Sequence, residues 1–247
     1  MPEHIPESEI HVWIVGLEAA GHRIAELSST LSPAENARIQ DFKFEDLKTH
    51  FVISRGLLRM LLGKYLSIPP AFLKLRYTNT GKPVLDMMNK TMYFSTSHSG
   101  RMAAYSFATH CEVGIDIEQI RDVPDVQAIA SRFFSPQEAA DLWTLDAVDR
   151  MRAFFTCWTR KEAYTKATGE GFSETPNSFT VTLRPDERAA FKSIGHDPLE
   201  ASRWSLYDLP CAPEYVGAVA FRGAQKVRVA GLQTAEDVLS QFVGLAS

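Results

Sequence analysis

The sequence predicts an α+β protein built from two similar halves, each a small, mostly antiparallel sheet packed with a long helix. Residues 32–35 (SPAE) and 135–138 (SPQE) are both helix starts with a capping box, and they lie 103 residues apart (135 minus 32). At the same offset, the apolar residues of 10–14 fall on those of 113–117. Because these matches share one offset, we interpret the chain as a weak internal duplication.

Apolar residues that recur every three to four positions predict the helices. Ile24 and Leu27 share one face of a short amphipathic helix. A long helix is expected over about residues 46–65, before the proline pair at 69–70, and its counterpart contains residues 154–155. The expected buried face of the first long helix consists of Leu47, Phe51, Leu58, Leu61 and Tyr65.

Runs of branched and aromatic residues predict the strands. We expect the two halves to join near residue 118, which gives an N-terminal half of 1–117 and a C-terminal half of 118–247, with the active site between them. The segment after about residue 222 carries no usable motif. The predicted strands are residues 10–15, 73–77, 92–95, 102–108 and 113–118, followed by 177–181, 204–209 and 215–221.

Length and composition exclude several classes of protein. The chain has 247 residues, 45% hydrophobic and 23% charged, which excludes disordered, collagen-like and coiled-coil chains. Its formal net charge of −4 argues against a broad nucleic-acid-binding surface but permits a local basic pocket. Cys111, Cys157 and Cys211 are too few and too widely spaced for a disulfide framework or a zinc site, and they suit a reducing cytoplasm. We expect neither a membrane span nor a signal peptide.

The strongest local signal is a pair of carboxylates on one predicted strand. Side chains alternate along a strand, so Asp116 and Glu118 point to one face while Ile115 and Ile117 point to the core. Two neighbouring carboxylates repel each other unless a cation compensates, and oxygen ligands of this kind suit Mg²⁺. The alternative is a solvated edge of an acidic protein.

A second signal lies on the second long helix. Trp158, Glu162 and Lys166 are spaced four apart and therefore share one helix face. Glu162 and Lys166 form either a simple surface ion pair or part of a site for phosphoryl chemistry. Trp158 favours the second interpretation because it draws that face toward the protein, and Gly169 and Gly171 then end the helix.

A third signal is a histidine among hydroxyl residues. His98 lies between Ser97 and Ser99 at the end of a predicted strand, and the turn at 80–83 presents Lys82. A lone histidine is usually structural, and a lysine on a turn is usually solvated. Together these groups are also suited to holding a phosphate. Motifs of P-loop, dinucleotide-binding, zinc-protease and common serine-hydrolase proteins are missing from the sequence.

The ordered set of motifs resembles the 4′-phosphopantetheinyl transferases of the larger, Sfp-like class, which are known for two similar halves in one chain. The resemblance spans about residues 81–171 and includes a segment from Arg38 through Arg59. Glu35 stands where some members carry a basic residue. The matching motifs are Gly81-Lys82-Pro83, residues 94–100, residues 114–118, Arg132-Phe133-Phe134-Ser135 with Glu138, and residues 158–166 with Gly169 and Gly171.

The resemblance implies Mg²⁺-dependent transfer of the phosphopantetheine arm of coenzyme A to a serine of an apo acyl or peptidyl carrier protein, releasing adenosine 3′,5′-bisphosphate. It implies that Asp116, Glu118 and Glu162 hold Mg²⁺, with Glu162 as ligand, base or both, and that Lys166 contacts the pyrophosphate. The N-terminal half would contact the adenosine and 3′-phosphate end of coenzyme A, and the C-terminal half would carry the catalytic helix. The residues implied at the coenzyme are Lys82, Ser97, His98, Arg38 and Arg55.

The same resemblance leaves the pathway open among fatty-acid, polyketide and nonribosomal-peptide synthesis. From the cysteines, the net charge, the lack of a long apolar run and the two halves in one chain, we expect a cytoplasmic monomer that binds neither nucleic acid nor membrane. Carriers of this kind are acidic, so Arg121, Arg132 and Arg160 are candidates for a docking patch.

Two rival hypotheses accompany the transferase. The first is a catalytically silent module that binds coenzyme A or a nucleotide. The second is a hydrolase built from Ser97 or Ser99, His98 and Asp116. Adjacent strand residues point to opposite faces, which disfavours the serine–histidine hydrogen bond that a hydrolase needs.

Overall fold

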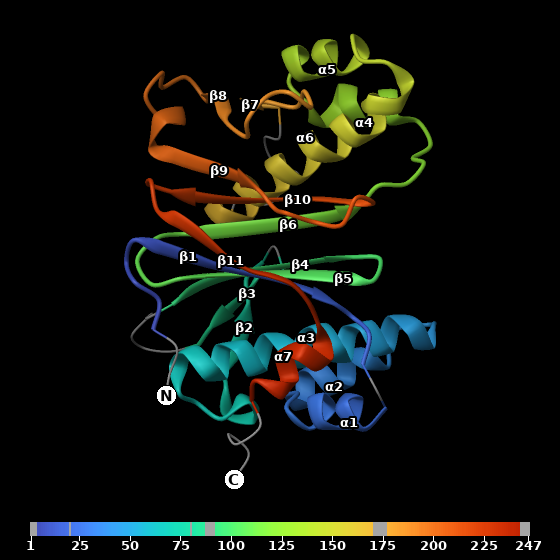
Figure 1. Cartoon of the computed structure of the whole chain (residues 1–247), viewed down its shortest axis with the longest axis vertical. Helices are drawn as coiled ribbons and strands as arrows, with labels where there is room; N and C mark the ends of the chain where they lie inside the picture. Colours follow the sequence, from blue (N-terminus) through green and yellow to red (C-terminus); the bar gives the residue numbers. More distant parts are fainter. Residues whose placement is uncertain (1–3, 20, 80, 87–91, 170–176, 243–247) are drawn as a thin grey trace.

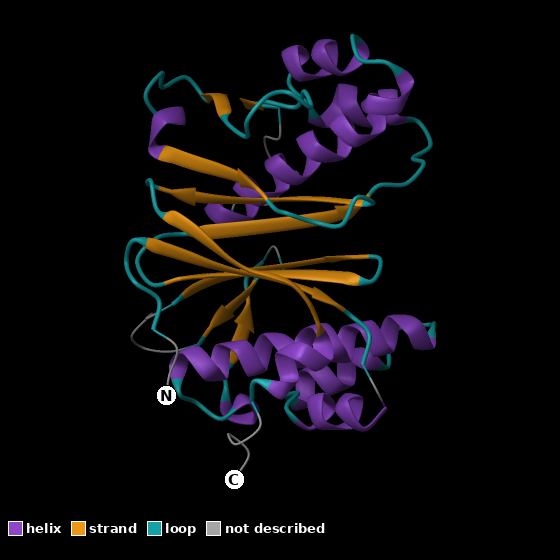
Figure 2. Ribbon diagram, viewed as in Figure 1, coloured by secondary structure: helices purple, strands orange, loops and turns teal. Residues whose placement is uncertain are grey.

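Two sheets stack across the middle of the molecule, and helices cover the outer side of each sheet (Figures 1 and 2). This computed structural model describes residues 4–19, 21–79, 81–86, 92–169 and 177–242. The architecture is the α+β class that the sequence predicts. Within the described ranges, no helix combines the length and the apolar character that a membrane crossing requires.

The first sheet has the strand order β11-β1-β5-β4. β1 pairs antiparallel with β5 and parallel with β11, so the last described strand returns to lie beside the first described one. The helices α1, α2, α3 and α7 lie on the outer side of this sheet (Figure 1). The bounds are β1 Glu9–Gly16, β4 Tyr93–Ser99, β5 Met102–Ala108, β11 Lys226–Thr234, α1 Gly21–Ser29, α2 Pro33–Ile39, α3 Glu45–Leu66 and α7 Ala235–Ser240.

The second sheet has the strand order β6-β10-β9, with both pairings antiparallel. Its outer side is covered by α6, with α4 and α5 beside that helix (Figure 1). Two small antiparallel pairs, β2 with β3 and β7 with β8, follow the two long helices. The bounds are β6 Val113–Gln119, β9 Trp204–Asp208, β10 Tyr215–Arg222, α4 Val126–Phe133, α5 Pro136–Trp143, α6 Ala147–Thr168, β2 Leu75–Tyr77, β3 Pro83–Leu85, β7 Phe179–Val181 and β8 Phe191–Ile194.

The two halves agree in several measurable features. The order β1-β5-β4 matches the order β6-β10-β9, and each of these pairings is antiparallel. The long helices α3 and α6 each contain 22 residues. The two halves therefore share strand order, strand direction and helix length.

Both predicted capping boxes are present, at Ser32 and at Ser135. Each capping glutamate also pairs with a buried cation on the neighbouring long helix. Glu35 Oε2 lies 2.7 Å from Arg59 Nε, and Glu138 Oε2 lies 2.9 Å from Lys161 Nζ. The cap therefore also ties each short helix to its long helix, which gives Glu35 a structural role.

The two sheets share an apolar layer made by alternate residues of their strands. Because side chains alternate faces, each central strand buries every second residue against the opposite sheet. This layer fixes the distance between β4 of one sheet and β6 of the other. It includes Ile10, Val12, Ile14, Ala104, Ile115, Ile117 and Val219.

The structure differs from the sequence-based expectations in four places. Leu47 is 47% exposed, because the first turn of α3 extends beyond the core. β4 continues through Ser99, so the predicted strand at 92–95 was too short. The segment after residue 222 forms β11 and α7. β6 spans Val113–Gln119, so a division after residue 117 falls inside this strand.

Candidate active site

β6 carries Asp116 and Glu118 on one face, as the alternation predicts. Ile115 and Ile117 on the other face are fully buried in the layer between the sheets. Asp116 is 4% exposed, whereas the Glu118 side chain is 21% exposed. The two carboxylates therefore do not form a solvated acidic edge, since one of them is buried.

Asp116 joins three elements of the fold. Its Oδ1 accepts hydrogen bonds from Ser97 Oγ on β4 and from Lys166 Nζ on α6, each at 2.6 Å. Its Oδ2 is buried and has no hydrogen-bond partner among the described residues. Burial raises the pKa of Asp116, and the bonds from Lys166 and Ser97 oppose that shift. This carboxylate has one oxygen held by the protein and one oxygen available.

Glu162 lies one turn before Lys166 on α6. The pKa of Glu162 is raised to about 7, mainly by burial; Lys166 opposes this shift, and the charges of Asp116 and Glu118 contribute to it. The three predicted carboxylates therefore lie within electrostatic reach of one another. In the described part of the chain, however, no three histidine, cysteine or acidic side chains already form a group that could hold a metal ion.

Aromatic packing holds this face of α6 toward the protein. Trp158 packs against Phe133 and Phe154, with ring centroids 5.7 Å and 6.1 Å apart. Gly169 ends the helix with a φ of 79°, a left-handed conformation that favours glycine. Gly171, the second glycine of that prediction, lies outside the described residues. Glu162 and Lys166 thus lie on a packed face and do not form an isolated surface pair.

Lys82 reaches the same region from the turn before β3. Its Nζ donates a hydrogen bond to the backbone carbonyl of Lys166. Lys82 is therefore close to the C-terminal end of α6, where Lys166 pairs with Asp116. Thr80, in the same predicted turn, lies outside the described residues.

His98 faces a group of cations. The imidazole reaches solvent on one side of β4, but desolvation by the surrounding protein, followed by the charges of Lys166, Arg55 and His50, lowers its pKa. A neutral histidine among cations is an arrangement that an anion would stabilise. Sequence reasoning missed His50, which precedes Phe51 on α3.

Arg38 and Arg55, the two arginines implied at the coenzyme phosphates, both lie beside the Phe51 ring. Both guanidinium carbons are 5.7 Å from the centroid of the Phe51 ring, and Arg55 is also 5.6 Å from that of Tyr77. Arg55 Nε lies 3.6 Å from Glu35 Oε1, while Arg55 Nη1 is buried without a hydrogen-bond partner among the described residues. Arg55 is thus preformed for an anion, and Arg38 is an exposed neighbour.

The hydrolase arrangement is not present. Ser97 donates its hydroxyl proton to Asp116 and is buried, whereas His98 points to the opposite face of β4 and is itself exposed. Ser99 donates to Glu118 Oε2 at 2.6 Å. Sequence reasoning missed these two serine–carboxylate bonds, although matching alternation in the two strands was a visible signal.

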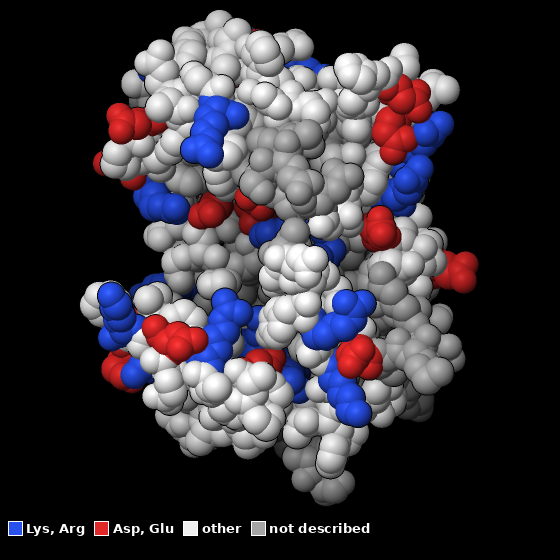
Figure 3. Space-filling model, turned by 180° about the vertical axis from the view of Figure 1, so that it is seen from behind, with Lys and Arg blue, Asp and Glu red and all other residues white. Residues whose placement is uncertain are grey.

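The view from behind shows a hollow between the two halves of the molecule (Figure 3). Acidic and basic side chains meet in it, and Lys and Arg side chains gather on the half that contains α3. This distribution agrees with a local basic region on a protein whose net charge is −4.

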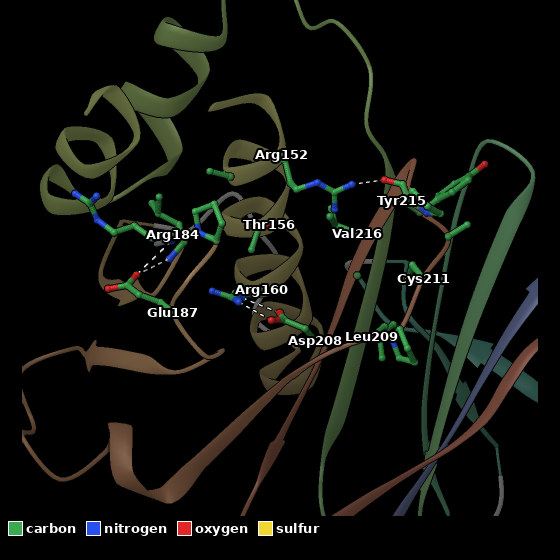
Figure 4. A pocket seen from close by; sticks show the side chains of 17 residues that line it. Arg152, Thr156, Arg160, Arg184, Glu187, Asp208, Leu209, Cys211, Tyr215 and Val216 are labelled. Carbon is green, nitrogen blue, oxygen red and sulfur yellow. Dashed lines mark hydrogen bonds and ion pairs between the residues drawn. The ribbon is translucent and has the colours of Figure 1, made fainter. Parts of the chain in front are cut away.

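A second pocket lies on the other side of α6. Figure 4 shows Arg152, Thr156 and Arg160 facing it, and positions 160 and 162 are about 200° apart around a helix. Arg160 is 2% exposed and makes two hydrogen bonds to Asp208, at 2.9 Å and 2.6 Å. The expectation that Arg160 belongs to a docking patch was wrong, since its guanidinium is buried and paired.

The other two docking candidates are exposed. Arg121 has a side chain 55% exposed and lies 3.0 Å from Glu118 Oε2. Arg132 is exposed on α4, with its guanidinium 5.0 Å from the Phe133 ring centroid. Both side chains are accessible to solvent, and Arg121 already pairs with Glu118.

Comparison with known proteins covers both halves of the chain. Residues 112–220 match the model of the 4′-phosphopantetheinyl transferase superfamily, and residues 18–110 match that of the 4′-phosphopantetheinyl transferase N-terminal domain. The chain is 35% identical over 217 residues to the 4′-phosphopantetheinyl transferase HetI of Nostoc sp., covering 87% of this chain and 88% of that protein.

A further relative and a solved structure complete the comparison. The 4′-phosphopantetheinyl transferase psf-1 of Bacillus pumilus is 30% identical over 224 residues, covering 90% of this chain and 92% of that protein. The holo-[acyl-carrier-protein] synthase of Thermotoga maritima is 18% identical, covers 46% of this chain and 64% of that chain, and superposes with a TM-score of 0.37. That score is too low to support an inference, whereas the sequence relatives cover almost the whole chain. The protein is therefore an enzyme that belongs to the 4′-phosphopantetheinyl transferase family.

Proposed function

We propose that this transferase moves the 4′-phosphopantetheine arm of coenzyme A to a serine hydroxyl of an apo acyl or peptidyl carrier protein, with Mg²⁺ and with release of adenosine 3′,5′-bisphosphate. The observation that carries the proposal is the buried Asp116, bonded to Lys166 and close to Glu162, next to the cations around His98. A diphosphate between these two groups would contact the cations Lys166 and Arg55, and its repulsion from the carboxylates would have to be compensated by a divalent cation.

The donor set fits a hard divalent cation. Asp116 Oδ2 is buried without a hydrogen-bond partner among the described residues, and a cation would compensate that orphaned oxygen. Asp116, Glu118 and Glu162 offer only oxygen ligands, which suit Mg²⁺. When bound, Mg²⁺ would neutralise charge on the diphosphate.

The protein's own groups supply the remaining chemistry. Lys166 is in position to bind the pyrophosphate and stabilise the charge that develops on the leaving oxygen. Glu162 lies where its carboxylate could act as a ligand of the cation or accept the proton of the attacking serine. Lys82, Arg55 and Arg38 would hold the phosphates at the adenosine end.

Incubation of the protein with apo carriers, coenzyme A and Mg²⁺ tests this function. We expect the mass of at least one of several acyl and peptidyl carriers to increase by one phosphopantetheine group. Asp116→Ala and Glu162→Ala should lose most of the turnover while circular dichroism shows a retained fold. If no carrier in a broad panel gains mass, the proposal is wrong; tight coenzyme A binding in that case would support a silent binding module.

Coenzyme A binding should take up protons near pH 7. His98 has a pKa below its usual value in the free protein, so it is neutral at this pH. A phosphate dianion beside it would raise that pKa and draw a proton onto the ring, so the affinity for coenzyme A should rise as the pH falls. Calorimetry in two buffers of different ionisation enthalpy measures the uptake.

The His98→Gln variant is the control for this experiment. It keeps a hydrogen-bonding side chain but has no group that titrates in this range. We expect the proton uptake to fall markedly in this variant. Equal uptake in both proteins would show that another group carries the proton, and would remove His98 from the phosphate site.

We also propose that the shared strand order and helix length of the two halves reflect an internal duplication. The agreement of β1-β5-β4 with β6-β10-β9 supports it. On this view the halves divide before β6, β11 and α7 return to the first half, and the site uses groups from both halves. One chain contributes all the proposed residues, which supports a monomer as the active form.

A further inference from the structure

Serine side chains join β4 to β6 across the gap between the two sheets. β4 pairs with β5 through its backbone, and β6 pairs with β10. Ser97 Oγ donates to Asp116 Oδ1 and Ser99 Oγ donates to Glu118 Oε2, both at 2.6 Å. Ser95, on the same face of β4, instead accepts a hydrogen bond from the backbone N–H of Ile115 at 3.2 Å.

The serines of β4 face the carboxylates of β6 because side chains on both strands alternate between two faces. Serines at 95, 97 and 99 point to one face of β4, and carboxylates at 116 and 118 point to one face of β6. Each serine can therefore meet one group on β6 without any change in register. Ser99 Oγ also accepts from the backbone N–H of Gln119, which fixes the direction of its own proton toward Glu118.

Each bond occupies one oxygen of its carboxylate. Asp116 Oδ1 receives Ser97 and Lys166, and Oδ2 is left buried without a hydrogen-bond partner among the described residues. On Glu118, Oε2 receives both Ser99 and Arg121. Holding one oxygen of a planar carboxylate fixes where the second oxygen points.

We propose that Ser97 and Ser99 are positioning residues that hold Asp116 and Glu118 so that Asp116 Oδ2 and Glu118 Oε1 face the divalent cation. This inference rests on the proposed Mg²⁺ site. A hydrogen bond to a charged carboxylate is strong enough to select one rotamer, and it removes rotational freedom that metal binding would otherwise have to remove. Ser97 directs its hydroxyl proton to Asp116 Oδ1, so the role proposed here acts through that carboxylate.

The test measures Mn²⁺ affinity by electron paramagnetic resonance, with coenzyme A present and no carrier protein. Ser97→Ala should bind Mn²⁺ about 10- to 100-fold more weakly than the unmodified protein, the usual effect of losing a hydrogen bond to a ligating group. Ser97→Thr keeps the hydroxyl and should restore most of the affinity. Ser95→Ala removes a hydroxyl from the same face of β4 that contacts no carboxylate, and should leave the affinity unchanged.

Turnover provides a second readout. At saturating Mg²⁺, Ser97→Ala should recover most of its rate, and its KM for the carrier should stay the same, because the loss lies in metal affinity. A variant that was only less stable would not show this dependence on metal concentration. If Ser97→Ala does not fold, Ser99→Ala allows the same comparison through Glu118.

The outcomes separate this proposal from the metal site itself. If the unmodified protein binds Mn²⁺ and Ser97→Ala binds it equally well, the positioning role is wrong and the metal site stands. If Ser95→Ala weakens binding as much as Ser97→Ala, the effect belongs to β4 as a whole and the positioning role is also wrong. If the unmodified protein binds no Mn²⁺ with coenzyme A present, both the metal site and the positioning role fall.

Discussion

Gly114→Ala should lower turnover by about 100-fold and destabilise the protein. A Cβ atom at residue 114 would lie 2.0 Å from the carbonyl oxygen of Ala163 and 2.4 Å from the amide nitrogen of Ala167. Both are backbone atoms of α6, so neither can rotate away. The helix would have to move away from β6, and such overpacking of a core typically costs about 1–3 kcal/mol or more.

The loss of activity follows from what the two elements carry. β6 holds Asp116 and Glu118, and α6 holds Glu162 and Lys166. The 2.6 Å bond between Lys166 Nζ and Asp116 Oδ1 exists only because glycine lets these elements approach each other. A displacement of about 1 Å between reacting groups can lower a rate by about 10²-fold. Steady-state turnover with an apo carrier, together with thermal unfolding, measures both effects.

Gly16→Ala is the matched control. Gly16 also lies in a strand, at the end of β1, but a Cβ atom there would lie 3.9 Å from the carbonyl oxygen of Gln233, an ordinary van der Waals distance. We expect this variant to keep nearly full activity. If Gly114→Ala were as active as Gly16→Ala, the close approach of α6 to β6 would not determine the site.

Local patterns were sufficient to predict most elements of the fold. The capping boxes at Ser32 and Ser135 and the long helices follow from spacing within a few residues, and the structure confirms them. The strand β11 was missed although Lys226, Val227, Arg228 and Val229 alternate in polarity. Its pairing partner is β1, more than two hundred residues earlier, and no local pattern specifies so distant a pairing.

The sequence could predict which residues belong to the candidate site, but not which of them contact one another. Alternation placed Asp116 and Glu118 on one face, and helical spacing placed Glu162 with Lys166. The bond between Ser97 and Asp116 depends on how two sheets pack, which is a tertiary property. For the same reason Arg160 was mistaken for a surface charge, since its partner Asp208 lies on β9.

The buried pair of Glu138 and Lys161 allows a large effect on stability to be predicted. Both residues are fully buried, and Glu138 also accepts hydrogen bonds from the backbone N–H groups of Ser135 and Val181, each at 2.7 Å. Glu138→Ala should lower the free energy of unfolding by about 3–5 kcal/mol, because it leaves the Lys161 ammonium buried without a counter-charge. Urea denaturation followed by circular dichroism measures this change.

Two further variants identify the cause of that loss. Glu45→Ala removes an ion pair with Lys48 in which the glutamate side chain is 83% exposed, and it should leave the unfolding midpoint unchanged. Glu138→Leu combined with Lys161→Met removes both charges and should recover part of the stability, since apolar replacement of a buried pair is often nearly neutral. If the double variant were no more stable than Glu138→Ala, the uncompensated ammonium would not be the cause, and the lost backbone hydrogen bonds of α5 and β7 would be.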